Sequence, residues 1–202
     1  EAKRQAEAAN LMLQDEFDGT SRNARALFPP DVMRFDLVNG AGRLTSTSTG
    51  ILPAMYSHPQ LRDFVAEFEF RAALNDDTGL GLIFRSEDAT DGLASYYMLL
   101  IHPVRQVAVL ACWNSGKWAS WREQALPPNI LASVGANQIR FEAIGSRFRA
   151  HLNGRPVLDV EDPTLQKPGL LGLCLSPASP RQTTVDFDNL AIHRVPPTTA
   201  PP

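Results

Sequence analysis

The sequence predicts an all-β protein, and three observations lead to this fold class. Short segments with alternating apolar and polar residues recur along the chain, clusters of Gly, Asn, Asp and Ser separate them, and no helical periodicity appears after residue 20. Many short strands divided by turns are typical of a β-sandwich or a barrel. The distances between turns vary and no block of sequence repeats, which argues against a propeller or a solenoid.

The composition fits one sizeable soluble domain. The chain has 202 residues, of which 44% are hydrophobic and 20% are charged. A net charge of −3 and the lack of a basic stripe argue against nucleic acid as a partner. No apolar run approaches the roughly 20 residues of a membrane-spanning helix, so we expect no membrane span in this chain.

The two ends differ from the middle. Residues 1–14 are rich in alanine and charged side chains and contain no Gly or Pro, which predicts an N-terminal helical extension or a linker. Residues 15–195 are expected to form the domain. Residues 196–202 form a Pro-rich tail, because proline cannot donate a hydrogen bond to a sheet.

The clearest strand covers residues 63–72, "DFVAEFEFRA". Its alternation places four apolar side chains on one face: Phe64, Ala66, Phe68 and Phe70. The strands expected after it cover residues 80–86, 94–101, 105–113, 117–123, 137–145, 147–152, 155–160, 169–176 and 183–195.

Two tight hairpins connect some of these strands. Asn153-Gly154 joins two of them and predicts a type I′ turn, which needs positive φ at both central positions. "NSG", residues 114–116, joins "RQVAVLACW" to "KWASWRE" and has similar hairpin chemistry. The second hairpin carries every tryptophan of the chain.

The order of motifs along residues 15–195 resembles a known fold family. The motifs are "LQDEFDG", "GLIFRSED", "YYMLLI", "NSGKWASW", "NQIRFEAIG", "LNGRPVLDV", "KPGLLGLCLS" and "VDFDNLAIHRV". They resemble concanavalin A-like (LamG-like) jelly rolls, particularly bacterial modules related to family 16 glycoside hydrolases or similar to 3-keto-disaccharide hydrolases. The resemblance implies two antiparallel sheets of six or seven strands each, with the first and last strands side by side.

Local catalytic chemistry is missing from the sequence. True family 16 hydrolases carry E-x-D-x-x-E on one strand, so that alternation directs the acids into one cleft, and this chain has no such motif. Its acid clusters are interpreted as solvated strands or turns: Glu67 and Glu69; Asn75, Asp76 and Asp77; Glu87, Asp88 and Asp91; Asp159, Glu161 and Asp162. The four histidines, His58, His102, His151 and His193, show no metal-ligand spacing. We predict no catalytic residue, although acids from distant strands would escape a motif search.

The tryptophans are the main candidates for a ligand site, and hairpin packing is the alternative. Trp113 and Trp118 can face each other across the hairpin. In a regular strand Trp121 would face the other way, so three rings on one face would require a bulge. Arg85, expected to face outward, and Tyr97 are the predicted polar neighbours of a sugar stacked on Trp113 or Trp118.

No cofactor is required by the sequence, but a structural calcium ion is possible. Jelly rolls of the type resembled often hold Ca²⁺ where the first strand meets the last, and calcium binds carboxylate and carbonyl oxygens. Glu16, Gly40 and Asp188 are the candidate ligands, with Asp15, Asp18 and Asp186 as alternatives for the two acids.

The two cysteines are expected to be buried thiols. Cys112 and Cys174 both lie in apolar, strand-like runs, and a disulfide between them stays open as the less favoured alternative.

Three functions follow from this interpretation. The first is a non-catalytic extracytoplasmic module that binds carbohydrate or another component of the cell envelope. The second is a structural or interaction subunit of a larger surface assembly or oligomer, anchored to protein partners through its termini. The third is a glycoside-processing hydrolase. A bacterial location outside the cytoplasm, whether secreted, periplasmic or on the cell surface, rests on the resemblance and on the Pro/Thr tail.

Overall fold

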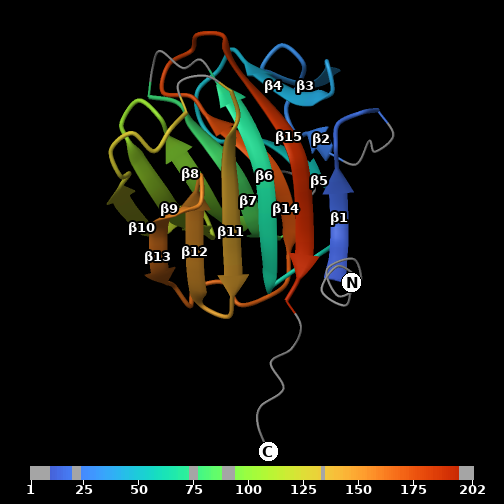
Figure 1. The fold of residues 1–202 in the computed structure, drawn as a ribbon. Coiled ribbons are helices and arrows are strands. Elements are labelled where there is room, and N and C mark those ends of the chain that lie inside the picture. Colours follow the sequence, from blue (N-terminus) through green and yellow to red (C-terminus); the bar gives the residue numbers. More distant parts are fainter. Residues whose placement is uncertain (1–9, 20–23, 73–76, 88–93, 133–134, 196–202) are drawn as a thin grey trace, which may run out of the picture.

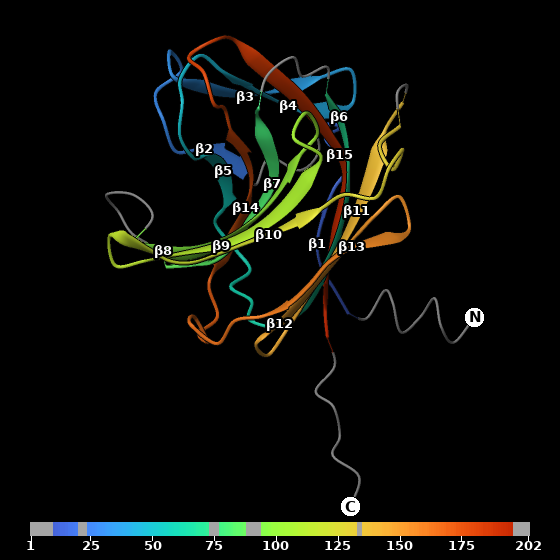
Figure 2. The same ribbon diagram turned by 90° about the vertical axis from the view of Figure 1, so that its left-hand side faces the viewer.

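The computed structural model describes residues 10–19, 24–72, 77–87, 94–132 and 135–195 as two antiparallel β-sheets packed face to face (Figure 1). Sheet A has the order β13(Arg155–Glu161), β12(Arg147–Leu152), β11(Asn137–Ile144), β6(Phe64–Ala72), β15(Thr183–Arg194), β4(Ala41–Ser46) and β3(Met33–Val38), and β1(Leu11–Asp15) also pairs with β15. Sheet B has the order β10(Lys117–Ala125), β9(Val107–Asn114), β8(Ser95–His102), β7(Gly79–Ser86), β14(Leu170–Ser176), β5(Leu52–Tyr56) and β2(Ala24–Ala26). In Figure 2, β8, β9 and β10 run side by side as one curved band, apart from β11, β12 and β13.

The all-β sandwich predicted from the sequence is confirmed. The elements in the described ranges are strands, eight in sheet A and seven in sheet B, where the resemblance implied six or seven in each. The described residues contain no helix long and apolar enough to cross a membrane.

The first and last strands lie side by side, as the resemblance implied. In β1 and β15 the Cα partner of Asp15 is Leu190. The expectation of a helix or linker up to residue 14 is therefore wrong for residues 11–14, because these residues hydrogen-bond to β15 and bury Leu13. Residues 1–9, the rest of this extension, and residues 196–202, the expected tail, lie outside the described residues.

The main core lies between the two sheets and contains the predicted apolar face of β6. Its members Phe64, Ala66, Phe68 and Phe70 are at most 1% exposed. Phe84 of sheet B packs against Phe141, Phe148 and Tyr97, with ring centroids 4.9 to 5.5 Å apart. Aromatic side chains from both sheets thus hold the layers together.

Both predicted hairpin turns have the required backbone. Asn153 and Gly154 have φ values of 50° and 76°, and Ser115 and Gly116 have φ values of 50° and 85°. Positive φ at both central positions matches the right-handed twist of the flanking strands. These turns set the pairing of β12 with β13 and of β9 with β10.

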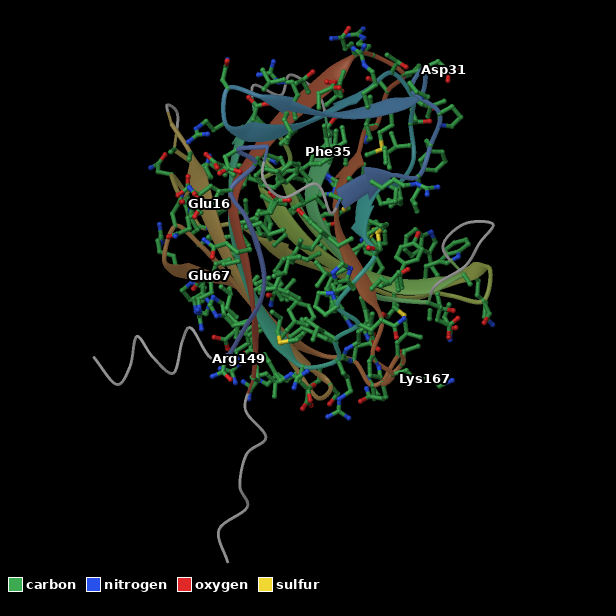
Figure 3. All side chains as sticks on the ribbon, turned by 90° about the vertical axis from the view of Figure 1, so that its right-hand side faces the viewer. Glu16, Asp31, Phe35, Glu67, Arg149 and Lys167 are labelled. Carbon is green, nitrogen blue, oxygen red and sulfur yellow. The ribbon has the colours of Figure 1, made fainter. Side chains whose placement is uncertain are left out.

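The outer face of sheet A is covered by ion pairs. The pairs are Arg43–Asp186, Arg71–Asp188, Arg140–Glu67, Arg149–Glu142 and Arg147–Asp159. Figure 3 shows polar side chains along this side of sheet A, among them the labelled Glu67 and Arg149. Arg71 also lies 3.7 Å from Glu69. The interpretation of Glu67, Glu69 and Asp159 as residues of solvated strands is consistent with these ion pairs, which are typical of a solvent-facing sheet.

Candidate functional site

The outer face of sheet B is apolar, unlike that of sheet A. A second cluster of buried side chains covers it, and this cluster draws its members only from sheet B: Met55, Ile83, Tyr96, Met98, Leu100, Val109, Ala111, Leu170 and Cys174. The register joins Trp121, Ala111, Met98, Ile83, Gly172 and Met55 into one row across six strands. This contrast makes sheet B the candidate binding face.

A β-bulge in β10 changes the direction of its side chains. Trp118 pairs with Trp113, but Ser120 pairs with Cys112, so β10 advances two residues where β9 advances one. Trp121 therefore pairs with Ala111, which lies on the same face as Trp113. The bulge that three tryptophans on one face would require is present.

The three indole rings contact one another at steep angles. The ring centroids of Trp113 and Trp118 are 5.0 Å apart at 77°, and those of Trp118 and Trp121 are 5.3 Å apart at 90°. Trp118 and Trp121 are 43% and 44% exposed, whereas Trp113 is half-buried against the apolar cluster. We call these three residues the tryptophan site. Edge-to-face contacts are favourable for aromatic rings, and hairpin packing alone would not require two rings to stay so exposed.

Charged side chains lie next to the tryptophan site, on the same face of sheet B. Glu123 is two residues beyond Trp121 and therefore on the same face, and both its carboxylate oxygens accept hydrogen bonds from Arg105 at 2.7 and 2.9 Å. Arg105 also lies 3.5 Å from Asp77, which contacts Nδ1 of His102 at 3.0 Å. We call Asp77, His102, Arg105 and Glu123 the polar end.

The polar end can offer hydrogen-bond donors and acceptors together. The side chains of Asp77, Arg105 and Glu123 are 34% to 38% exposed, so a ligand can reach them. His102 is buried, and its Nε2 has no hydrogen-bond partner among the described residues. A guanidinium between two carboxylates suits neighbouring hydroxyl groups, which both donate and accept.

Beneath the hairpin, on the core side of sheet B, lies the buried carboxylate of Asp162. Its Oδ1 accepts hydrogen bonds from the Tyr97 hydroxyl at 2.7 Å and from the Thr164 N–H at 2.9 Å, and its Oδ2 accepts one from the Ser120 hydroxyl. Burial opposes ionisation, but the hydrogen bonds from Ser120, Thr164 and Tyr97 outweigh it and hold the pKa of Asp162 below its ordinary value. The interpretation of Asp162 as part of a solvated strand end is wrong, because this residue is 4% exposed.

Arg85 does not face outward as predicted. Its backbone has a φ of 49°, and the pairing of β7 with β14 shifts by one residue at this point. The side chain turns into the molecule, lies over the Phe148 ring and donates to the carbonyl oxygens of Arg62, Gly145 and Leu165. The local bulge thus reverses the phase that strict alternation assigns to Arg85, and the guanidinium binds the chain itself.

Tyr97 is also directed inward. It is fully buried, stacks on Phe84, donates to Asp162 and accepts from the N–H of Leu165 at 3.1 Å. Burial raises the pKa of its hydroxyl, which therefore stays a donor at neutral pH. Arg85 and Tyr97 accordingly hold the fold together, and of the four predicted ligand-binding residues only Trp113 and Trp118 lie on the outer face.

The predicted calcium ligands have other contacts in the structure. Glu16 accepts a hydrogen bond from Gln14 at 2.6 Å, Asp188 pairs with Arg71 at 3.3 Å, and Gly40 lies in the exposed β3–β4 turn. Among the described residues, no group of three or more His, Cys, Asp or Glu side chains is arranged to hold a metal ion. A structural calcium ion stays a prediction.

The cysteines are buried free thiols, which confirms the favoured of the two predictions from the sequence. Cys112 belongs to the core between the sheets, whereas Cys174 belongs to the cluster on the outer face of sheet B. Because they lie on opposite faces of one sheet, no disulfide joins them.

Comparison with known proteins assigns the fold. No known family and no curated protein matches the sequence. The structure is similar to the carbohydrate-binding module CBM66 from Bacillus subtilis, with 19% identity, a TM-score of 0.64 and coverage of 86% of this chain and 98% of that one. It is similar to a protein of unknown function with a galectin-like fold from Bacillus subtilis (11% identity, TM-score 0.67, 92% and 96% covered) and to a β-glucanase from Bacillus licheniformis (10%, 0.66, 92% and 98%). The concanavalin A-like jelly-roll sandwich implied by the resemblance is confirmed.

Sequence reasoning missed Trp121, the polar end and Asp162. Trp121 was excluded from the site by strict alternation, and the run "WASW" on one strand was the only signal for a bulge. Asp77, Arg105 and Glu123 are far apart in the sequence, and the successive pairing of β7, β8, β9 and β10 brings them together.

Proposed function

We propose that this chain is a non-catalytic module that binds carbohydrate through the tryptophan site and the polar end. The observation that carries the proposal is the pair of exposed rings, Trp118 and Trp121, with Glu123 and Arg105 immediately beyond them on the same face. An indole ring packs against the apolar face of a pyranose, and nearby polar groups fix its orientation through the hydroxyls. Similarity to a carbohydrate-binding module and to a β-glucanase supports this reading.

The ligand is a flexible glycan chain. Trp118 and Trp121 meet at 90°, so a flat crystalline surface can lie against only one of the two exposed rings. A single chain can stack one sugar on one ring, touch the other ring from the side and continue toward Glu123. Residues two apart on a strand are separated by roughly 7 Å, which gives an extended ligand contacts at both ends.

The non-catalytic assignment is supported by what the site contains. The sequence lacks the E-x-D-x-x-E strand, and the two acids of the polar end, Asp77 and Glu123, are both paired with Arg105. A protein that binds glycans in this way would act outside the cytoplasm, which we propose for this chain in a bacterium. The roles as a structural subunit and as a hydrolase stay predictions.

Binding is tested with three probes: soluble mixed-linkage β-1,3-1,4-glucan, amorphous cellulose and microcrystalline cellulose. The two celluloses share their chemistry and differ in the flatness of the surface. We expect binding to a soluble or amorphous probe. We expect Trp118→Ala or Trp121→Ala to reduce affinity about tenfold or more, since aromatic hot spots contribute about 2 kcal/mol or more.

The control is Phe28→Ala, which removes another exposed aromatic ring, 41% accessible, near the opposite edge of sheet B. It should leave binding unchanged. Equal loss in all three variants, or no binding to a panel of glycans, would contradict the proposed function. Release of reducing sugar from the glucan would favour the hydrolase instead, and preferential binding to microcrystalline cellulose would contradict the flexible-chain ligand.

A further inference from the structure

The bulge in β10 separates two possible arrangements of the same hairpin. In the observed register Trp118 and Trp121 face outward and Ser120 faces the core. Regular pairing beyond Trp118 would turn Ser120 outward and Trp121 toward the core, because side chains alternate along a strand. Nothing in the local sequence forces the bulge, since residues 117–125 contain no glycine.

A buried polar contact distinguishes the two registers. The Ser120 hydroxyl donates to Asp162, whose carboxylate is held by Tyr97 and Thr164 at the end of β13. In the regular register Ala119 would take the core-side place opposite Cys112, so this carboxylate would lose the Ser120 hydroxyl and face a methyl group instead. A buried charged acceptor that loses a donor is costly, so the carboxylate favours the register with Ser120 inward.

We infer that Asp162 is a positioning residue for the tryptophan site: by holding Ser120 on the core side, it keeps Trp118 and Trp121 together on the outer face. A second contact supports the same register further along β10. The side chain of Gln124 accepts a hydrogen bond from the N–H of Asp159 at 3.2 Å, so the edges of the two sheets are joined at two points. The side chains that donate to the Asp162 carboxylate, Tyr97 and Ser120, both lie on the core side of sheet B.

The binding part of the test rests on the proposed function, but the structural part does not. Indole rings in contact, as in the Trp113–Trp118–Trp121 series, give exciton-coupled bands in far-UV circular dichroism. We expect the wild-type protein to show such a couplet and Trp121→Phe to weaken it. Ser120→Ala and Asp162→Asn should weaken the couplet as well, while Ser120→Thr, which keeps the hydroxyl, should retain it.

The matched control for lost stability is Ser46→Ala. Ser46 is a fully buried serine of sheet A whose hydroxyl is also hydrogen-bonded, so its removal costs stability without touching β10. It should leave the couplet unchanged. Affinity for the soluble glucan should fall in Ser120→Ala and Asp162→Asn, by less than in Trp121→Ala, and not in Ser46→Ala.

The outcomes separate the two proposals. Failure of the wild-type protein to bind any glycan overturns the proposed function, while the couplet still tests the positioning role. A folded Ser120→Ala variant with a wild-type couplet overturns the positioning role, whatever the protein binds. If Asp162→Asn does not fold, the Ser120→Ala and Ser120→Thr pair decides the matter.

Discussion

Trp118 and Ser120 are two residues apart on one strand and yet face opposite sides of sheet B. In a regular strand they would share a face. The bulge between them gives β10 an aromatic outer side and a hydrogen-bonded inner side at the same point. The exposure of Trp121 beside Trp118 and the contact of Ser120 with the buried Asp162 therefore occur together, at one backbone irregularity.

Tyr97→Phe should destabilise the protein without changing its outer face. The substitution removes the donor to the buried carboxylate of Asp162 and the acceptor of the half-buried Leu165 N–H. Leaving such groups unpaired costs about 1–3 kcal/mol, measurable as the loss of unfolding free energy in urea. Tyr96→Phe, on the opposite face of the same strand, is the control and should lose less. Equal losses of unfolding free energy in the two variants would contradict a stabilising role of the Tyr97 hydroxyl.

Arg85→Lys should be strongly destabilising despite conserving the charge. The guanidinium serves three carbonyl oxygens, those of Arg62, Gly145 and Leu165, with separate N–H groups at 2.6 to 3.0 Å. A single ammonium cannot reproduce this planar fork, and each hydrogen bond to a charged group that is lost costs about 1.5–3 kcal/mol. Arg147→Lys, in an exposed pair with Asp159, should change the unfolding free energy far less. A similar, small change in both variants would contradict the structural role of Arg85.

Asp162 should contribute stability that disappears in acid. Its pKa in the folded protein is held below the value of about 3.9 expected in the unfolded chain, so the contribution is present above about pH 4. It is lost as the pH falls through the lower, folded-state value. The difference in unfolding free energy between wild type and Asp162→Asn should therefore shrink from pH 5 to pH 2. The other carboxyl groups are present in both proteins, so their contributions cancel in this difference. If the difference in unfolding free energy did not change with pH, the lowered pKa of Asp162 would be contradicted.

Cys112 and Cys174 should be unreactive in the native protein. Both are buried, and burial raises the pKa of the Cys112 thiol to about 12, so almost no thiolate exists at pH 8. A thiol reagent followed by mass spectrometry should label both cysteines in denaturant and neither under native conditions. Rapid native labelling of either one, or a mass showing a disulfide, would contradict this arrangement.

Local patterns in the sequence are enough to predict the all-β class, the alternation of β6, the two tight hairpins and the burial of both cysteines. These features follow from local rules: side chains alternate along an extended chain, and Asn-Gly turns favour positive φ. The same alternation misplaced Arg85, and it set Trp121 apart from Trp118. These positions depend on the folded arrangement of the strands, because partners on other strands fix a bulge. For Arg85 the partners are three carbonyls distant in sequence; for the tryptophans the partner is Asp162, which bonds Ser120 from the opposite sheet.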